Sequence, residues 1–465
     1  MQLGSGDIKT AFLQGSQTEL QDQLYGQPPP EVRRMLNMKD HEVLRIVKAV
    51  YGLLNAPKQW FVSLSQFLIE DGWLQHSLDQ CLYKRVDVHG NIVGYIGIHV
   101  DDLLCAGIGE EYESSIQRLR EKFRFGTWDL AMDKSLVYCG CEIKQHENFS
   151  ISLKQERFAL SIDEIVISNE RKTEGFAEVT PEERRGMRQA LGALNWRATQ
   201  SAPWLLATVS HLQGCVETAT VEEVCAVNKL VRLQRKRFDQ GLFFPVVTGA
   251  VTLITFTDAS WATRKDLSSQ GGQITLLVQE NMLKGSKSPF CVVSWRSRRL
   301  RRVARSSTSA EAQMTGNALD THEFCKLALC DLETNGKLDL RKTDELLSSF
   351  KSSLVCDARN IFDGIVKVET SGLQMEEKRT AIELLAVKER LKQANVDLKW
   401  VDGEQELADG LTKPWKHEPL IKALDRSEWR IIYDPAFQSA RRKRALGIQN
   451  VDLVHWLHCL FALEH

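Results

Sequence analysis

The sequence predicts a multidomain protein of mixed α/β and α+β class. Three observations lead to this fold class. Strand-like and helix-like segments alternate through about the first 145 residues, a helical pattern with few breakers fills 180–238, and strands and helices alternate again after 248. The chain has 465 residues, of which 43% are hydrophobic and 26% charged. It is therefore long enough for about two to four domains with cores of their own.

In the first region, residues 7–13 are expected to run from the end of a strand into a helix. Further strands are expected at 43–47, 81–86 and 92–99, helices at 59–70 and 111–123, and a hairpin at 135–143 with 150–153. The adjacent acids Asp101 and Asp102 stand between the strand 92–99 and the apolar Leu103-Leu104. This pattern is typical of a hairpin with a charged tip.

The middle region opens with Thr180-Pro181-Glu182-Glu183, a capping signature at the start of a helix. Strand character returns at 251–257, after Thr248-Gly249, and marks a boundary. Further strands are expected at 272–278, 290–295, 353–357 and 396–401, with helices at 308–333, 376–394 and from about 406. The expected domains are 1–145, 146–247 and 248–415, and residues 416–465 show no clear architecture.

Charge and cysteine content narrow the class of protein. The net charge of −1 gives no overall support to a nucleic-acid partner, but three basic clusters stand out, one of them with six arginines in residues 296–305 and the others at 232–237 and 441–444. Each could contact phosphate or could be a solvated basic face. The eleven cysteines show no paired CxxC spacing, and no apolar run reaches membrane-spanning length. We therefore expect an intracellular protein with reduced thiols and no membrane partner.

Three acids of the first region could hold metal. Asp7 at a strand end and Asp101 with Asp102 on a hairpin could share two Mg²⁺ ions, which would hold a primer 3′ hydroxyl and a nucleoside triphosphate. Neighbouring residues of a strand point to opposite sides, so Asp101 and Asp102 should differ, one as the main ligand and one as a secondary ligand. A solvated acidic turn is the structural alternative.

Four acids of the C-terminal region form a second candidate set: Asp258, Glu311, Asp357 and Asp409. Asp258 and Asp357 could simply terminate strands, Glu311 matches a capping box with Thr308, and Asp409 could cap a short helix. Strand ends and helix starts can, however, converge at one edge of a sheet. Four convergent carboxylates repel each other unless cations lie between them. Two Mg²⁺ ions about 4 Å apart would satisfy them and activate water against a phosphodiester.

Nine sequence blocks, in order through residues 7–414, resemble the reverse transcriptase and RNase H segments of copia-type retrotransposon Pol polyproteins. The blocks are Asp7–Gly15, Ala49–Pro57 with Gln59-Trp60, Asp79–Tyr83, His99–Leu104, Thr257–Ala262, Ser294-Trp295, Ser306–Glu311, Cys356-Asp357 and Leu407–Lys413. The resemblance implies a reverse-transcriptase palm at 1–145, a largely helical thumb or connection at 146–247, and an RNase H-like domain with a mixed five-stranded sheet at 248–415.

The resemblance also implies the function of particular residues. Asp7, Asp101 and Asp102 would be the polymerase metal ligands, and Asp258, Glu311, Asp357 and Asp409 the RNase H ligands, with two Mg²⁺ (or Mn²⁺) ions in each site. Phe12 would exclude a 2′ hydroxyl, although it could equally be a buried aromatic at a helix start. The other implied substrate-binding residues are Tyr51, Gly52, Arg298, Arg299, Arg301 and Arg302. The implied partners are RNA, DNA, their hybrid, dNTPs and other Pol or Gag segments, in cytoplasmic virus-like particles with a nuclear phase.

The sequence also departs from the family pattern. His99 replaces a Tyr, Leu54-Asn55 replaces Lys-Gln, Ser309 and Gln313 replace a Glu and a Tyr, and Ala381-Ile382-Glu383 replaces His-Ile-Asp. The fingers region that precedes the first palm block is absent, so we expect a fragment. Two hypotheses stand: an RNA-directed DNA polymerase with RNase H activity, and a decayed, non-catalytic remnant that binds nucleic acid.

Overall fold

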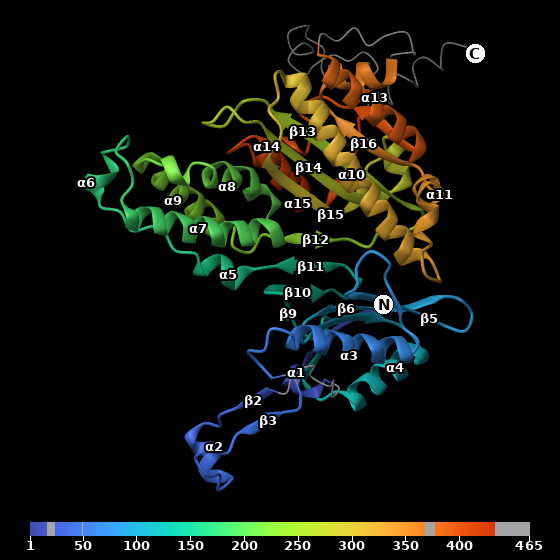
Figure 1. Cartoon of the computed structure of the whole chain (residues 1–465). Coiled ribbons are helices and arrows are strands. Elements are labelled where there is room, and N and C mark those ends of the chain that lie inside the picture. The colour runs from blue at the N-terminus through green and yellow to red at the C-terminus, as the bar shows by residue number, and fades with distance from the viewer. Residues whose placement is uncertain (16–23, 49, 368–376, 433–465) are drawn as a thin grey trace. The chain divides into compact units, whose positions relative to one another are not determined.

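The computed structural model describes residues 1–15, 24–48, 50–367 and 377–432 (Figure 1). These residues form two compact units, Met1–Phe149 with Ala328–Arg341, and Ser150–Leu327 with the residues from Lys342 onward. The boundaries expected at 145/146, 247/248 and 415/416 stay predictions. Among the described residues, no helix has both the length and the apolar character needed to cross a bilayer. The basic cluster at 441–444 lies outside the described residues.

The first unit is built on a six-stranded antiparallel sheet in the order β4-β5-β6-β7-β1-β8. Its strands are β1 Gln2–Ile8, β4 Leu74–Gln75, β5 Leu82–Val86, β6 Ile92–His99, β7 Asp102–Gly107 and β8 Phe125–Leu130. The helices α3 (Ala56–Glu70) and α4 (Glu110–Lys122) pack on it through an apolar core that includes Trp60, Leu64 and Leu119. Every strand and helix expected at 43–123 is present.

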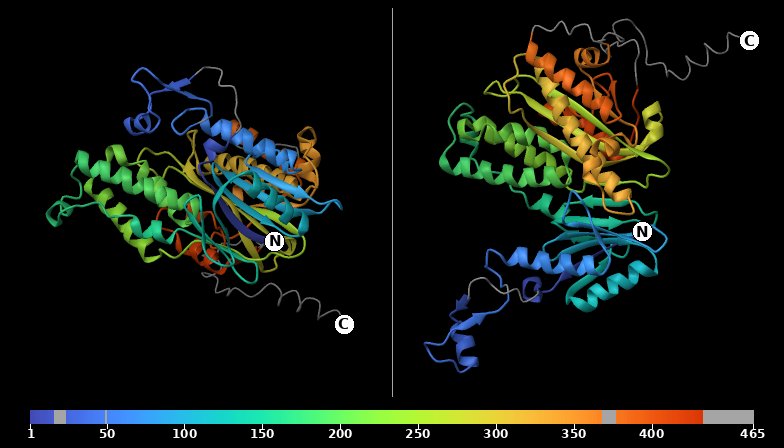
Figure 2. Two further views of the ribbon diagram at one scale, coloured as in Figure 1. Left: turned by 90° about the horizontal axis from the view of Figure 1, so that it is seen from below. Right: turned by 45° about the vertical axis from the view of Figure 1, so that its right-hand side comes forward.

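Three smaller pieces complete this unit. The short helix α1 (Ala11–Gln14) follows β1, and the hairpin of β2 (Leu24–Gly26) and β3 (Leu44–Ile46) carries α2 (Pro30–Met35) away from the sheet (Figures 1 and 2). The strands β9 (Leu136–Tyr138) and β10 (Cys141–Gln145) form a hairpin of their own within the segment expected as one strand. Cys139 and Gly140 both adopt positive φ, 49° and 72°, the geometry of a type I′ turn.

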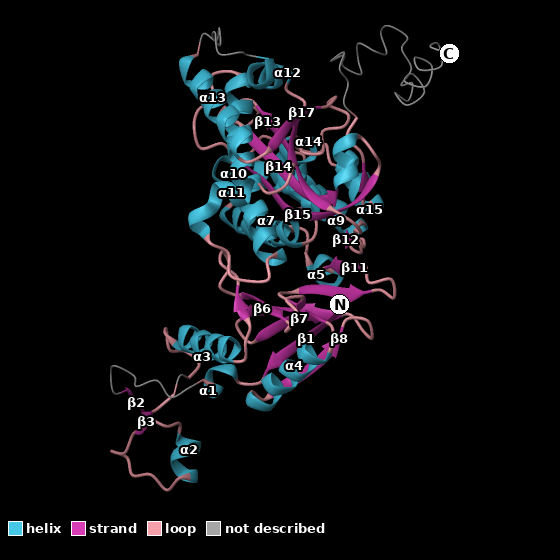
Figure 3. Ribbon diagram, turned by 90° about the vertical axis from the view of Figure 1, so that its right-hand side faces the viewer, coloured by secondary structure: helices cyan, strands magenta, loops and turns pink. Residues whose placement is uncertain are grey.

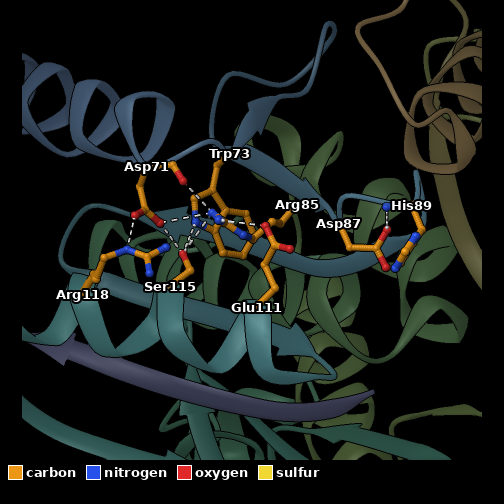
Figure 4. Close-up of polar contacts among 8 residues, drawn as sticks. All are labelled: Asp71, Trp73, Arg85, Asp87, His89, Glu111, Ser115 and Arg118. Carbon is orange, nitrogen blue, oxygen red and sulfur yellow. Dashed lines mark hydrogen bonds and ion pairs between the residues drawn. The ribbon is translucent and has the colours of Figure 1, made fainter.

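A polar network joins the end of α3 to β5 and α4 (Figure 4). Asp71 accepts hydrogen bonds from Arg85 (3.1 Å) and Arg118 (2.5 Å), and Trp73 Nε1 donates to Ser115 Oγ at 2.8 Å. Arg85 Nη2 also reaches Glu111 Oε1 at 3.3 Å. Because Arg85 is buried, these carboxylates satisfy a charge that would otherwise be costly. The network therefore has a structural role: it holds α4 against β5 and the end of α3.

The second unit begins with a largely helical part. Its elements are β11 Ile151–Lys154, α5 Glu156–Ser161, α6 Asn169–Lys172, α7 Pro181–Gln200, α8 Leu206–Gln213, α9 Val221–Lys236 and β12 Leu242–Phe244, with a 3₁₀ turn at Pro203–Leu205. The capping box predicted at Thr180 and Glu183 is present at the start of α7. The helices α7 and α9 bury Leu191, Leu194 and Val227 in a shared core, so the predicted helical region is confirmed.

The rest of the second unit is built on a mixed sheet in the order β17-β16-β13-β14-β15-β18. The strands are β13 Val251–Ser260, β14 Gln270–Gln279, β15 Ser288–Arg299, β16 Ser352–Cys356, β17 Val396–Trp400 and β18 Glu428–Trp429. β13, β14 and β15 are antiparallel, and β16 and β17 run parallel to β13. All five predicted strands are present, and the mixed sheet that the resemblance implies is confirmed.

The sixth strand corrects the sequence-based count. β18 and the helix α15 (Glu418–Arg426) lie in residues 416–465, where no architecture was expected. β18 has only two residues and shows no period in the sequence. α15 buries Leu420, Ile421 and Leu424, but nine residues are too few for a strong periodic signal.

Helices cover both faces of this sheet. The long helix α10 (Ser307–Glu333) and α13 (Lys378–Gln393) pack on one face through Ala318 and Leu384, while α14 (Asp409–Thr412) and α15 pack on the other through Leu411 and Leu420. Figure 3 shows α10 and α13 on one side of the strands and α15 on the other. The remaining helices are α11 Thr343–Ser348 and α12 Arg359–Phe362, the latter followed by a π turn at Asp363–Lys367.

Candidate metal centre

Three of the four acids expected in the C-terminal region meet at one edge of the mixed sheet. Asp258 lies in β13, Asp357 directly follows β16, and Asp409 is the first residue of α14. One ligand oxygen from each lies within 4.8 Å of the other two, and no other three acidic, histidine or cysteine side chains of the described residues are grouped in this way. β13 and β16 are parallel neighbours, so their carboxyl ends share one edge. The predicted convergence of these three acids is therefore observed.

Glu311, the fourth acid, reaches the same place from α10. It is buried, and its carboxylate accepts a hydrogen bond from the backbone of Ala259, beside Asp258. Its second oxygen, Oε2, has no hydrogen-bond partner among the described residues. Burial and the nearby charges of Asp258 and Asp357 raise the pKa of Glu311 well above its ordinary value. Glu311 is not in the group within 4.8 Å, but an unpaired buried carboxylate oxygen close to other carboxylates is a position that a cation would satisfy.

Of the structural alternatives left open for these acids, only one describes the position of its residue. Ser306 Oγ accepts the backbone N–H of Ser309 at 3.1 Å, so Ser306, not Thr308, caps α10, and the capping role for Glu311 is wrong. Asp258 is not a turn residue, because β13 continues to Ser260 and pairs Asp258 with Gly272. Asp357 does lie at a strand end, directly after β16, so for this acid the strand-end alternative describes the position. The side chain of Asp409 binds lysines instead of capping α14.

Two adjacent glycines of β14 let helices approach both faces of the sheet at this edge. A Cβ added to Gly271 would lie 2.4 Å from Met314 Sδ of α10, and one added to Gly272 would lie 2.8 Å from the Cβ of Leu411 in α14. Neither contact is possible for a larger residue without movement of a helix. The close approach of α14 also brings the hydroxyl of Thr412 to Asp258, to which it donates a hydrogen bond. The glycines thus position both helical contributions to the centre.

The electrostatics of the cluster favour a bound cation. Burial raises the pKa of Asp258 to about 7, and the charges of Asp357 and Asp409 add to the rise while Lys413 opposes it. Burial, followed by the charge of Asp409, raises the pKa of Asp357. All four donors are oxygen atoms of carboxylates, the ligands that Mg²⁺ and Mn²⁺ prefer. The residues present therefore fit a divalent metal centre.

Sequence reasoning missed three residues of this centre. Glu406 is buried, accepts the backbone N–H of Ala408 at 3.0 Å, and has an unpartnered Oε2. Burial and the charge of Asp357 raise the pKa of Glu406 well above its ordinary value. Lys413 and Lys416 each bind one oxygen of Asp409. The one available signal was the four-residue spacing of Asp409 and Lys413, which places them on one face of a helix.

The acids expected in the first unit lie where they were predicted, Asp101 and Asp102 at a hairpin tip and Asp7 near the end of the neighbouring strand β1. Asp7 in β1 stands directly opposite Asp102 in β7, and Asp101 lies in the turn between β6 and β7. Burial, then the charges of Asp101 and Asp7, raise the pKa of Asp102. Unlike the three acids of the second unit, these three carboxylates do not all lie within 4.8 Å of one another. Asp102 and Asp101 are thus non-equivalent, and their assignment as ligands stays a prediction.

The turn that carries Asp101 has a strained backbone and is held by a hydrogen bond from a buried indole. Val100 adopts φ 57°, a left-handed conformation that costs a β-branched residue about 1–3 kcal/mol. Trp60, which is buried in α3, donates its Nε1–H to the carbonyl of Val100 at 2.6 Å. A Cβ on Gly126 would lie 2.7 Å from Asp7 Oδ2, so this glycine leaves room for the Asp7 carboxylate. The surroundings hold the acidic turn in one conformation.

The structure also places the expected substrate-binding residues. The rings of Phe12 and Tyr51 lie together, with centroids 4.7 Å apart, and Gly52 adopts φ +96° with open space at its Cα. Arg298 and Arg299 end β15, and Arg299 pairs with Asp266 at 2.9 Å. Arg302 binds Glu383 of α13, and Arg301 is exposed. Of the cluster at 232–237, Arg232, Arg235 and Arg237 form ion pairs with acids.

The sequence of the chain is similar to those of known proteins. Residues 3–183 match the family "Reverse transcriptase (RNA-dependent DNA polymerase)". The retrovirus-related Pol polyprotein from transposon RE1 of Arabidopsis thaliana is 24% identical over 424 residues, or 88% of this chain, and that from transposon TNT 1-94 of Nicotiana tabacum is 24% identical over 329 residues, or 66% of this chain. The chain is thus similar to copia-type retrotransposon Pol polyproteins, and its residues 3–183 match a reverse transcriptase family.

The chain spans about a quarter of the length of the curated relatives that it matches, 26% for RE1 and 23% for TNT 1-94. Among solved structures, it is similar to a foamy viral protease-reverse transcriptase in complex with dsDNA. That similarity has 10% sequence identity and a TM-score of 0.45, and covers 86% of this chain and 68% of the other.

The structure shows the contacts of the residues that depart from the family pattern. His99 pairs with Asp102 across the hairpin and opposes the rise in the pKa of that acid. Asn55 precedes α3 without a side-chain capping bond. Ser309 and Gln313 are buried on α10, and Glu383 on α13 holds Arg302. None of these replacements removes a carboxylate of the metal centre.

Proposed function

We propose that the second unit is a ribonuclease H that hydrolyses the RNA strand of RNA–DNA hybrids with two divalent metal ions. The observation that carries this proposal is the group of Asp258, Asp357 and Asp409, whose ligand oxygens lie within 4.8 Å of one another, with the unpartnered Oε2 of Glu311 beside it. Carboxylates that are buried together and repel each other need cations between them. Phosphodiester hydrolysis is the chemistry that a paired divalent centre of this kind supplies.

Each residue of the centre would have a particular role. Asp258, Glu311, Asp357 and Asp409 would hold Mg²⁺, or Mn²⁺ in its place, and bound ions of this kind lower the pKa of water and stabilise charge on phosphate oxygens. Thr412 orients the Asp258 carboxylate through its hydroxyl. Gly403 leaves space beside Asp357, because a Cβ there would lie 3.1 Å from Oδ2. The sheet edge thus fixes the ligands before metal or substrate arrives, which lowers the cost of assembling the site.

We also propose that the first unit is the palm of an RNA-directed DNA polymerase. Asp7 and Asp102, directly opposite each other in β1 and β7, would bind the two metal ions with Asp101. Phe12, backed by Tyr51, would then select deoxynucleotides by contact with the sugar. The family match over residues 3–183 supports this assignment. RNA, DNA, dNTPs and other Pol or Gag segments are the corresponding partners, and cytoplasmic virus-like particles with a nuclear phase the corresponding site of action.

A hybrid-cleavage assay tests the proposal. Purified full-length chain should cut the RNA strand of a labelled RNA–DNA hybrid in Mg²⁺ or Mn²⁺, and Asp357→Asn should abolish cutting while leaving hybrid binding in EDTA intact. The exposed Asp239→Asn is a matched control that should cut at the wild-type rate. Binding without cleavage by the wild-type chain in either metal would instead support the non-catalytic remnant. Primer extension with dNTPs on the same preparation tests the palm separately.

A further inference from the structure

Two lysines occupy the solvent side of the metal centre. The ammonium of Lys413 binds Asp409 Oδ1 and that of Lys416 binds Asp409 Oδ2, so both carboxylate oxygens carry a cation. Lys413 also lies 3.7 Å from Asp258 Oδ2. The Asp409 side chain is only 4% exposed, whereas those of Lys413 and Lys416 are 38% and 47% exposed. The lysines therefore reach a buried ligand from a surface that a substrate can touch.

The backbone that carries these lysines is held in place. The N–H of Lys413 donates to the carbonyl of Asp409 at 3.0 Å, and that of Lys416 donates to the carbonyl of Lys413 at 3.1 Å. Between them, Trp415 adopts φ 65°, donates its N–H to Thr208 Oγ1 at 3.1 Å, and lies under the ammonium of Lys229 at 4.7 Å. The anchored loop keeps both stems at the centre, so only the flexible side chains need to move.

An ammonium and a divalent ion compete for Asp409. A metal ion on either oxygen would lie within a few ångströms of a lysine charge, and like charges at that distance repel strongly in a partly buried site. An ammonium group has only donors, so when it leaves the carboxylate it must be hydrated by water or bound by another anion, and the anion also offsets its charge. A phosphodiester at the mouth of the centre supplies that anion, because lysine binds phosphate as a flexible point charge.

We propose that Lys413 and Lys416 keep Asp409 paired until a phosphodiester of the nucleic acid draws them away, so that the centre takes up divalent ions together with its substrate. This inference rests on the proposed ribonuclease H function. In this proposal the two lysines are positioning residues. They bind the phosphate of the substrate, and by doing so they free the carboxylate of Asp409 to bind metal. Since coupling between two ligands is reciprocal, Mg²⁺ must strengthen hybrid binding by the same factor as the hybrid strengthens Mg²⁺ binding.

Calorimetric titration of Mg²⁺ into the full-length chain tests the coupling without any need for turnover. The titration is run with and without an RNA–DNA hybrid whose RNA strand is 2′-O-methylated, with Mg²⁺ uptake by the hybrid alone subtracted. For the wild-type chain, the hybrid should tighten Mg²⁺ binding about tenfold or more, within the range usual for coupled sites. For Lys416→Gln, binding without hybrid should already be about fivefold tighter, and the hybrid should add less than about threefold.

Two further variants separate this exchange from a general effect of charge. Lys422→Gln removes one exposed positive charge from α15 and should behave as the wild type. Lys416→Arg keeps the charge and should restore most of the coupling. The proposal is overturned if Lys416→Gln binds Mg²⁺ as the wild type does without hybrid, or if both chains gain equally from the hybrid. If the wild-type chain binds no Mg²⁺ in either condition, the metal centre itself fails, which is a distinct result.

Discussion

Replacing Asp258 with Asn should stabilise the metal-free protein. Burial, aided by Asp357 and Asp409, raises the pKa of Asp258 from 3.8 to about 7. At about 1.4 kcal/mol per pH unit, ionised Asp258 then costs the folded state at most about 4 kcal/mol above pH 7. The pKa is higher in the folded than in the unfolded chain, so the cost is absent below about pH 4, grows through the interval and is complete above about pH 7. Because Lys413 and Thr412 lose a charged partner in the variant, we expect a net gain of about 1–3 kcal/mol.

Urea unfolding in EDTA at pH 8 and pH 4.5 measures this gain. Asp258→Asn should unfold at higher urea than the wild type at pH 8, and the difference should shrink at pH 4.5. Mg²⁺ should stabilise the wild type and have little effect on the variant, because a ligand stabilises only the state that binds it. Asp133→Asn, which changes an exposed acid, should match the wild type throughout. Equal midpoints for Asp258→Asn and wild type at pH 8 in EDTA would refute the idea that these carboxylates repel one another in the folded protein.

Three further predictions concern packing, pH and strain. Gly272→Ala would place a Cβ 2.8 Å from Leu411, so it should lower the free energy of unfolding by about 1–3 kcal/mol in denaturant and weaken Mg²⁺ binding. Gly192→Ala, with open space at its Cα, should have neither effect. Wild-type stability and Mg²⁺ binding in Gly272→Ala would contradict the close approach of α14. Burial, with the charge of Lys326, lowers the pKa of His322 to about 3. The folded protein should therefore lose about 1.4 kcal/mol of stability per pH unit as the pH falls below about 6.5, where the unfolded chain binds a proton at this histidine. In His322→Gln, the free energy of unfolding should fall less steeply at acid pH, and an unchanged slope would show that His322 is not the cause. Val100→Gly should raise the unfolding free energy by about 1 kcal/mol, because glycine adopts the left-handed conformation of Val100 without strain, and a lower unfolding free energy would show that the valine side chain is needed.

Long, regular patterns made most of the fold predictable. The five strands of the mixed sheet, the helical region after Thr180 and the acidic hairpin at Asp101 were all expected, because apolar periodicity marks each of them. The convergence of Asp258 and Asp357 was predictable for a related reason: acids that follow apolar strands collect at one edge when the strands are parallel.

What could not be predicted depends on short signals or on tertiary contacts. Thr308 and Glu311 match a capping box in sequence, yet the cap of the helix lies two residues earlier, at Ser306, because both serine and threonine can cap. The two lysines and Glu406 join the centre only through the turn at α14, which no periodic pattern specifies. β18 is too short to leave any pattern.

Cleavage of an RNA–DNA hybrid as a function of Mg²⁺ concentration tests the central claim most directly. We expect the full-length chain to cut the RNA strand with a rate that saturates in Mg²⁺, and EDTA to stop the reaction. Asp357→Asn should lower the rate by a factor of at least about a thousand, while its affinity for the hybrid, measured in EDTA, stays within about twofold of that of the wild type. Cleavage by Asp357→Asn at the wild-type rate, or cleavage by the wild type that persists in EDTA, would contradict the claim.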